Sequence, residues 1–158
     1  MKRVNMAVGL VCLVVGAAST TACGGAAPAT AKSATTAGMP GTTAPATVEE
    51  QIALGQKLYG QKCASCHGAN GEGDAKDPPV VGKDALPLEP RPTQKVRKAK
   101  FMTAADVGTF VKSTMPADAP GTLTDTEALA ILAFDLHANG VKLEKMVDPA
   151  YAAGIKLH

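Results

Sequence analysis

Bulky side chains are scarce in this sequence of 158 residues. It has no tryptophan, three phenylalanines and two tyrosines, so aromatic residues make up only 3%. This composition excludes an aromatic-rich platform on which nucleic-acid bases would stack. Between Val48 and the last residue, Val, Ile, Leu and Phe supply 24 of 111 residues, close to the roughly 20% below which charged chains tend to stay disordered. Such a thin core predicts support from disulfides, a metal, a partner or a large apolar cofactor, and it disfavours a self-sufficient β-sandwich or barrel.

A basic surface is also missing from the part of the chain that we expect to fold. The formal charge of +2 includes Lys2, Arg3 and Lys32, whereas residues 48–158 carry 13 Lys and Arg against 14 Asp and Glu. Their net charge of −1 gives no indication of a general nucleic-acid-binding surface.

The first residues are typical of an export signal. Lys2 and Arg3 precede an uncharged, mainly apolar run of 13 residues, Met6–Ala18, which suits a signal peptide and is short for a membrane span. The segment Ser19–Gly24 resembles a bacterial lipobox, in which a cysteine is lipidated at its new N-terminus after cleavage. We therefore expect a lipid anchor at Cys23, with ordinary cleavage and a free thiol as the alternative.

Small residues dominate the segment that follows. Of the 24 residues in 24–47, 22 are Gly, Ala, Ser, Thr or Pro, which is typical of a flexible tether. The chain thus divides into a signal peptide (1–22), an anchor and tether (23–47) and one domain (48–158) that includes a C-terminal tail (141–158). This organisation predicts an exported domain, in the periplasm or at the cell surface, held to a membrane by its anchor.

Three threonines mark the starts of three predicted helices. Thr47, Thr103 and Thr124 are each followed three residues later by an acid, the pattern of an N-cap with a capping box or its weaker Asp form. We expect helices over 48–62, 103–113 and 125–138, the last ending at Asn139-Gly140. No stretch alternates at period two, so the predicted class is all-α.

A motif with specific chemistry follows the first predicted helix. Cys63-Ala64-Ser65-Cys66-His67 is C-x-x-C-H, the covalent attachment motif of c-type haem. Two thiols at this spacing can each add to one haem vinyl group, and the next residue places an imidazole under the iron. Zinc would need a second ligand pair, and a thioredoxin-like dithiol a βαβ context; the sequence has neither. The irregular, proline-containing segment 68–100 that follows is long for a loop within one domain, which indicates function.

These features together resemble a class I cytochrome c. The resemblance covers about residues 52–140 and includes Gly71-x-Gly73, the run Pro78-Pro79-Val80-Val81-Gly82 and Met115-Pro116. It implies an all-α cytochrome c-like fold, with three main helices and long irregular loops around one haem c that is bound through Cys63 and Cys66. It also implies that the first helix, at Gly55 and Tyr59, crosses the last helix near Phe134.

The resemblance also implies the ligands of the iron. His67 would be the proximal ligand, its second ring nitrogen donating to the backbone carbonyl of Pro78. Met115 would be the sixth ligand, a thioether that stabilises ferrous iron. The weaker rivals are Met102, Met146 and Met39; His137, which suits the negative end of a helix; and His158 at the chain terminus.

Two further features remain open at this stage. The stretch 91–100 carries five positive charges, at Arg91, Lys95, Arg97, Lys98 and Lys100. It is either a solvated loop or a patch that steers an acidic redox partner, and one of its arginines could pair with a haem propionate. Asp135 stands where the family is usually apolar, and we interpret it as a sign that this face of the last helix is solvated.

The predicted function is one-electron transfer between redox partners outside the cytoplasm. With His67 and Met115 both bound to iron there is no open position for a substrate, so the expected protein is an electron carrier and not an enzyme. The alternative is the electron-accepting cytochrome subunit of a dehydrogenase or oxidase. A gas-binding or peroxidatic haem domain is a third possibility, which requires Met115 to be absent or labile.

Overall fold

The computed structural model describes residues 44–158, which form five helices. In chain order these are α1 (Val48–Lys62), α2 (Ala64–His67), α3 (Ala104–Thr114), α4 (Asp125–Ala138) and α5 (Pro149–Gly154). The described part contains no β-strand, only an isolated antiparallel bridge between Thr103 and Lys156. The all-α prediction is confirmed, and the helices expected over 48–62 and 125–138 coincide with α1 and α4.

The three predicted N-caps explain where the long helices begin. The Thr47 hydroxyl accepts from the Glu50 amide at 3.2 Å, and Thr124 does the same for the Glu127 amide at 3.2 Å. At the start of α3 the Thr103 amide donates to the Asp106 carboxylate at 2.8 Å. Each bond satisfies an amide that the helix itself leaves without a partner.

Helices α1 and α4 pack directly against each other. A Cβ at Gly55 would lie 1.9 Å from the carbonyl oxygen of Ala130, so the two backbones touch at a point that only glycine permits. One turn further along, the rings of Tyr59 and Phe134 lie 5.3 Å apart. The expected crossing of the first and last predicted helices is therefore present.

Small residues fill much of the buried interior. Of the 15 buried hydrophobic residues within 44–158, five are alanines, as expected for a chain with few bulky side chains. Two of the fifteen, Val147 and Ala152, come from the tail 141–158 and pack in the same cluster as Val107 and Leu136. The tail is thus part of the core, and its helix α5 was not predicted from the sequence.

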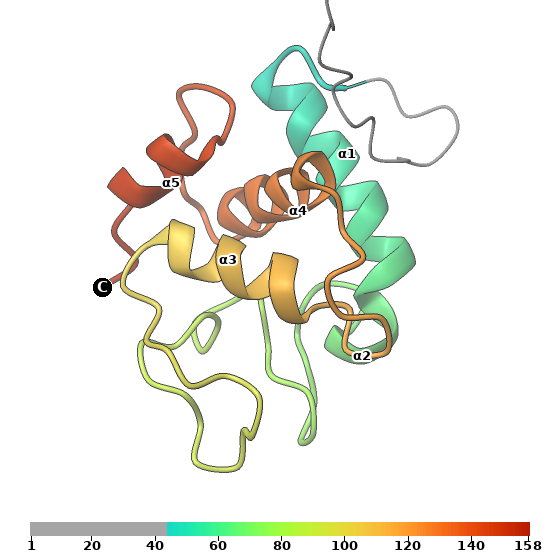
Figure 1. Ribbon diagram of the computed structural model, residues 1–158, viewed down its shortest axis with the longest axis vertical. Coiled ribbons are helices and arrows are strands. Elements are labelled where there is room, and N and C mark those ends of the chain that lie inside the picture. The colour runs from blue at the N-terminus through green and yellow to red at the C-terminus, as the bar shows by residue number, and fades with distance from the viewer. Residues whose placement is uncertain (1–43) are drawn as a thin grey trace, which may run out of the picture. The chain divides into compact units, whose positions relative to one another are not determined.

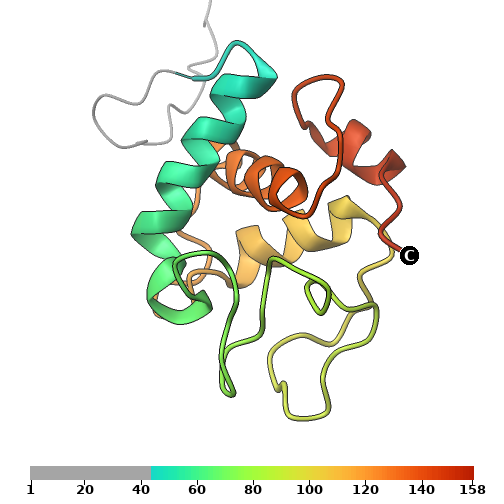
Figure 2. The ribbon, with the colours of Figure 1, turned by 180° about the vertical axis from the view of Figure 1, so that it is seen from behind.

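The irregular segment 68–100 gathers on one side of the helices. Figures 1 and 2, from opposite sides, show α1 running steeply along one edge, α4 crossing it, and the loops below α3 at the end of α1 that carries α2. This arrangement brings α2, the loops and the C-terminal end of α3 around a common space.

The predicted signal peptide, Cys23 and Met39 lie outside the described residues. Among the helices within 44–158, none has the length and apolarity required to cross a bilayer.

Candidate functional site

The C-x-x-C-H motif lies where α1 ends and α2 begins. Cys63 leaves the helical conformation, with φ −123° and ψ −36°, and the short helix α2 then carries Cys66 and His67. The His67 amide donates to the Cys63 carbonyl at 2.9 Å. The Tyr59 hydroxyl donates to the Gly68 carbonyl at 2.8 Å, which ties the end of the motif back to α1. Both thiols are free, and they sit at the two ends of one helical turn.

The His67 ring is held by one backbone group. Its Nδ1 atom lies 2.7 Å from the carbonyl oxygen of Pro78. A carbonyl only accepts, so Nδ1 carries the proton and Nε2 keeps the lone pair that a metal ion needs. The loop that supplies Pro78 is fixed in turn by the Gly73 amide, which donates to the His67 carbonyl at 2.7 Å. Gly73 has φ +63°, a conformation that favours glycine.

A cavity of about 460 Å³ opens beside this motif. This volume is within the roughly 300–1,000 Å³ range of sites for cofactors and small ligands. Its walls come from α1, α2, α3, α4 and the loops, and they are largely apolar, with Leu86, Phe101, Val107, Phe110, Val111 and Ile131. A large apolar group joined to Cys63 and Cys66 fits such a space, so the residues present suit a haem.

The structure places Met115 and His67 in the wall of the same cavity. Met115 caps the C-terminus of α3, where its amide donates to the Val111 carbonyl at 3.0 Å. Of the methionine and histidine side chains within 44–158, no others line this cavity. Met102 and Met146 are 48% and 38% exposed, and the His158 ring bonds to the Leu86 carbonyl.

Burial shapes the chemistry of Cys63. It raises the pKa of this thiol to about 12, and the negative charge of Asp135 contributes further. The thiol is therefore neutral at physiological pH, and a thioether at this position would also carry no charge into the cavity.

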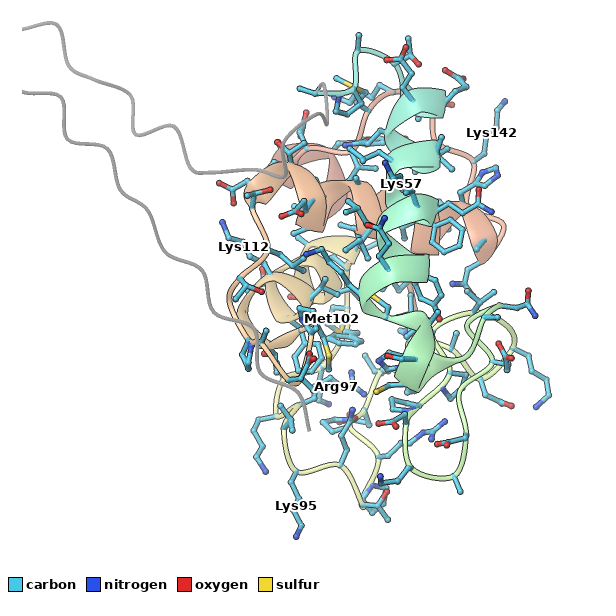
Figure 3. All side chains as sticks on the ribbon, turned by 90° about the vertical axis from the view of Figure 1, so that its right-hand side faces the viewer. Lys57, Lys95, Arg97, Met102, Lys112 and Lys142 are labelled. Carbon is cyan, nitrogen blue, oxygen red and sulfur yellow. The ribbon has the colours of Figure 1, made fainter. Side chains whose placement is uncertain are left out.

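Arg97 differs from the other cations of the basic stretch, because it is buried. It is only 2% exposed, and its guanidinium donates to the carbonyls of Leu88 and Glu89 and lies 3.9 Å from the centre of the Phe101 ring. Burial lowers its pKa from the ordinary value. Arg97 lines the cavity with its buried guanidinium, whereas the side chain of Lys95, which also borders the cavity, extends away from the ribbon, as Figure 3 shows. Arginine prefers such stacked sites because it sheds water more easily than lysine.

Asp135 corrects one interpretation of the sequence. We expected a solvated helix face here, but the side chain is 3% exposed and lines the cavity. Burial raises the pKa of its carboxyl to about 8. The polarity of an aspartate indicated solvent from the sequence, and its position on the inner face of α4 became visible only from the packing.

The sequence does not reveal that Asn139 helps to form the cavity. Its side-chain amide donates to the carbonyls of Val80 and Asp135 at 2.8 Å each, and its oxygen accepts from the Gly82 amide at 3.0 Å. We read Asn139 only as a helix terminator. It also binds the loop that follows Pro78 to the end of α4, so it holds one wall of the cavity.

Comparison with known proteins gives consistent results. Residues 52–137 match the family model described as Cytochrome c. The chain is 34% identical over 91 residues to a thiosulfate dehydrogenase of Psychrobacter arcticus and 30% identical over 105 residues to one of Stutzerimonas stutzeri. These matches cover 58% and 61% of this chain but only 27% and 31% of the relatives, so the chain spans less than a third of their length.

A solved structure shares the fold. The sulfane dehydrogenase SoxCD of Paracoccus pantotrophus matches with a TM-score of 0.52 and 29% identity, over 67% of this chain and 52% of that one. The family model covers more than half of the chain and includes the C-x-x-C-H motif. The chain therefore belongs to the cytochrome c family, whose members bind haem c covalently and transfer electrons.

Proposed function

We propose that this cytochrome carries one electron at a time on a single haem whose axial ligands are His67 and Met115. The observation that carries the proposal is the 2.7 Å contact between His67 Nδ1 and the Pro78 carbonyl, because it leaves Nε2 of a buried histidine free in the cavity wall that also contains Met115. When bound, haem supplies a reversible one-electron couple between ferric and ferrous iron.

The residues around the cavity favour electron transfer and disfavour chemistry on a bound substrate. Cys63 and Cys66 bind the cofactor through thioethers, and the apolar wall formed by Phe101, Phe110 and Ile131 excludes water. If His67 and Met115 both bound the haem iron, it would have no open position for a substrate. The chain by itself is therefore a carrier and not an enzyme.

A second candidate is the electron-accepting subunit of a dehydrogenase for inorganic sulfur compounds. It is supported by the names of the relatives, two thiosulfate dehydrogenases and a sulfane dehydrogenase. In this case the oxidation would occur on a partner protein, and this chain would remove the electrons one by one.

The N-terminal sequence supports a place outside the cytoplasm. Export by the signal peptide over 1–22 and lipidation at Cys23 would attach the domain to a membrane through the tether 24–47. A free chain of this composition lets the domain reach partners at some distance from its anchor.

Exposed lysines near the cavity support a docking surface for an acidic redox partner. Lys95 and Lys98 are exposed, and Lys100 pairs with Glu89 at 2.5 Å. Electrostatic steering weakens as salt screens the charges. Electron transfer to a protein partner should therefore slow with rising ionic strength, and a rate that is independent of salt would contradict this docking surface.

One set of spectra tests the cofactor and its ligands. We expect a covalent haem c spectrum with the weak near-infrared band of methionine ligation. The reduced protein should not bind carbon monoxide, Met115→Ala should lose the near-infrared band and bind it, and Met102→Ala should behave like the unsubstituted protein. Carbon monoxide binding by the unsubstituted protein to the same extent as by Met115→Ala would overturn the His67 and Met115 assignment.

Purification separates the two candidates. A free carrier should elute from size exclusion as a single small protein, whereas a subunit should co-purify with an enzyme that oxidises thiosulfate or another sulfur compound. Activity that co-elutes with the cytochrome would favour the subunit, and its absence from the cytochrome fractions would favour the carrier.

A further inference from the structure

Asp135 is a buried acidic group in the cavity wall that the electron-transfer proposal does not use. Its side chain is 3% exposed, and its Oδ1 atom has no hydrogen-bond partner among the described residues. A buried polar atom without a partner is costly and rare, since nearly all such atoms in folded proteins are paired. The position therefore calls for a role that a leucine would not serve.

No neighbouring charge compensates Asp135. From α1, three ionisable side chains line the cavity: Tyr59 donates its hydroxyl to the Gly68 carbonyl, Lys62 lies 3.7 Å from Glu127, and Cys63 is neutral. The wall from α3 is apolar, with Val107, Phe110 and Val111. The remaining ionisable groups of the wall are Cys66 and His67 of α2 and, from the loops, Lys76, Asp77, Lys95, Arg97 and Asp118.

Asp135 nevertheless senses charge inside the cavity. Its negative charge contributes to raising the pKa of both Tyr59 and Cys63, after burial, which is the larger cause in each case. Interaction between charges is strong at such sites because little water screens them. A carboxyl in this place responds in turn to any change of charge at the group that fills the cavity.

We propose that Asp135 is a proton-binding site coupled to electron transfer, so that the protein takes up a proton with each electron and releases it on oxidation. This inference rests on the proposed function of one haem attached at Cys63 and Cys66. On reduction, one electron arrives from the redox donor and one proton from water binds Asp135 Oδ1, which converts the carboxylate to the neutral acid. On oxidation both leave, and the net charge of the cavity is the same in the two states.

The direction follows from electrostatics. In the oxidised state one extra positive charge in the cavity favours the carboxylate of Asp135, and the arrival of an electron removes that charge and favours the acid. Burial alone brings the pKa of Asp135 to about 8. The pKa of Asp135 is therefore lower in the oxidised state than in the reduced state, and between these two values the arrival of an electron decides whether the proton is bound.

Redox titrations across pH test the coupling. We expect the reduction equilibrium of the haem-loaded protein to shift by up to tenfold per pH unit in a window below about pH 8, which is about 59 mV for a one-electron couple. Asp135→Asn, which cannot ionise, should remove this dependence in the same window. Asp84→Asn makes the same change at an exposed carboxyl away from the cavity and should keep it. The near-infrared band of the fully oxidised protein is recorded at each pH, so that loss of Met115 from the iron is recognised.

Infrared difference spectra of reduced minus oxidised protein give a second readout, which detects the protonated carboxyl directly. A carboxylic C=O band should appear on reduction, shift in D₂O and be absent in Asp135→Asn. An intact haem c spectrum combined with a pH-independent reduction potential and no such band would overturn the proton coupling while leaving the electron carrier in place. A pH dependence that persists unchanged in Asp135→Asn would assign it to another group and would equally overturn the proposal. Failure of the haem spectrum itself would refute the proposed function instead.

Discussion

Gln51 and Val147 lie 96 residues apart in the chain and are joined by a reciprocal pair of buried hydrogen bonds. The Gln51 side-chain amide donates to the Val147 carbonyl at 2.9 Å, and the Val147 amide donates to Gln51 Oε1 at 2.7 Å. Gln51 thus satisfies both backbone groups of a residue in the tail and fixes the tail to α1. This pair turns a segment with few bulky side chains into part of the core.

Gln51→Ala should therefore destabilise the protein. Both backbone groups of Val147 would be left buried without partners, at a cost of about 2–4 kcal/mol in the free energy of unfolding. Gln61→Ala removes the same atoms from an exposed position of the same helix and should change stability by less than about 0.5 kcal/mol. Denaturant unfolding of both variants measures the difference, and equal effects would show that the pair contributes nothing specific.

The crossing of α1 and α4 makes Gly55 sensitive to a single methyl group. In Gly55→Ala the new Cβ would lie 1.9 Å from the Ala130 carbonyl oxygen, and backbone cannot move aside as a flexible side chain does. We expect a loss of about 3 kcal/mol or more, at the upper end of the cost of overpacking. Thermal unfolding of the haem-loaded protein measures this loss.

Gly60 provides the matched control on the same helix. Nothing lies within 4 Å of a Cβ at this position, so Gly60→Ala should raise stability by up to about 1 kcal/mol through helix propensity. If Gly55→Ala proved as harmless as Gly60→Ala, the close contact of the two backbones would be wrong.

Several parts of the fold follow from local signals that are readable in the sequence. Thr47 and Thr124 act as N-caps because the acid three residues later lies on the same turn, and that spacing is visible without a structure. Helix α5 depends instead on Asp148, whose carboxylate accepts from the Tyr151 amide at 2.7 Å. It has only six residues, too few for a hydrophobic period to emerge.

In the candidate site, too, some residues can be predicted from the sequence and others cannot. The spacing of Cys63, Cys66 and His67 is local and was sufficient to predict a haem site. The burial of Arg97 and Asp135 could not be read from the sequence, because charge usually indicates solvent and their burial results from contacts with distant segments, such as the Phe101 ring that lies against Arg97. Only tertiary packing decides which charged side chains of a loop or helix face inward.

The titration of Asp135 should make the free energy of unfolding depend on pH. Its pKa in the folded protein is about 8, against an ordinary value of 3.8, so the folded state holds this proton more tightly than the unfolded state. Its contribution to stability is therefore full below about pH 4, falls as the pH rises from about 4 to 8, and is constant above that.

Asp135→Asn removes this titration. We consider the gap between the two reduced proteins, which is the free energy of unfolding of the variant minus that of the unsubstituted protein. This gap should increase by up to about 1.4 kcal/mol per pH unit between pH 4 and 8. Denaturant unfolding at several pH values measures the gap. The free energy of unfolding of Asp84→Asn should depend on pH in the same way as that of the unsubstituted protein. A gap that is independent of pH would mean that Asp135 does not change its protonation on folding.

The small core finally predicts that this polypeptide depends on its cofactor. A third of the buried hydrophobic residues are alanines, and a cavity of about 460 Å³ lies between the helices and the loops, so the chain alone leaves much apolar surface uncovered. The double variant Cys63→Ala, Cys66→Ala, prepared without haem, should therefore be largely unfolded by circular dichroism and lack a cooperative melt. Ser65→Ala alters one of the two residues between the thiols and should retain haem and fold. A native-like cooperative melt of the haem-free double variant would mean that the polypeptide folds stably without haem. The stability of the fold would then not depend on filling the cavity.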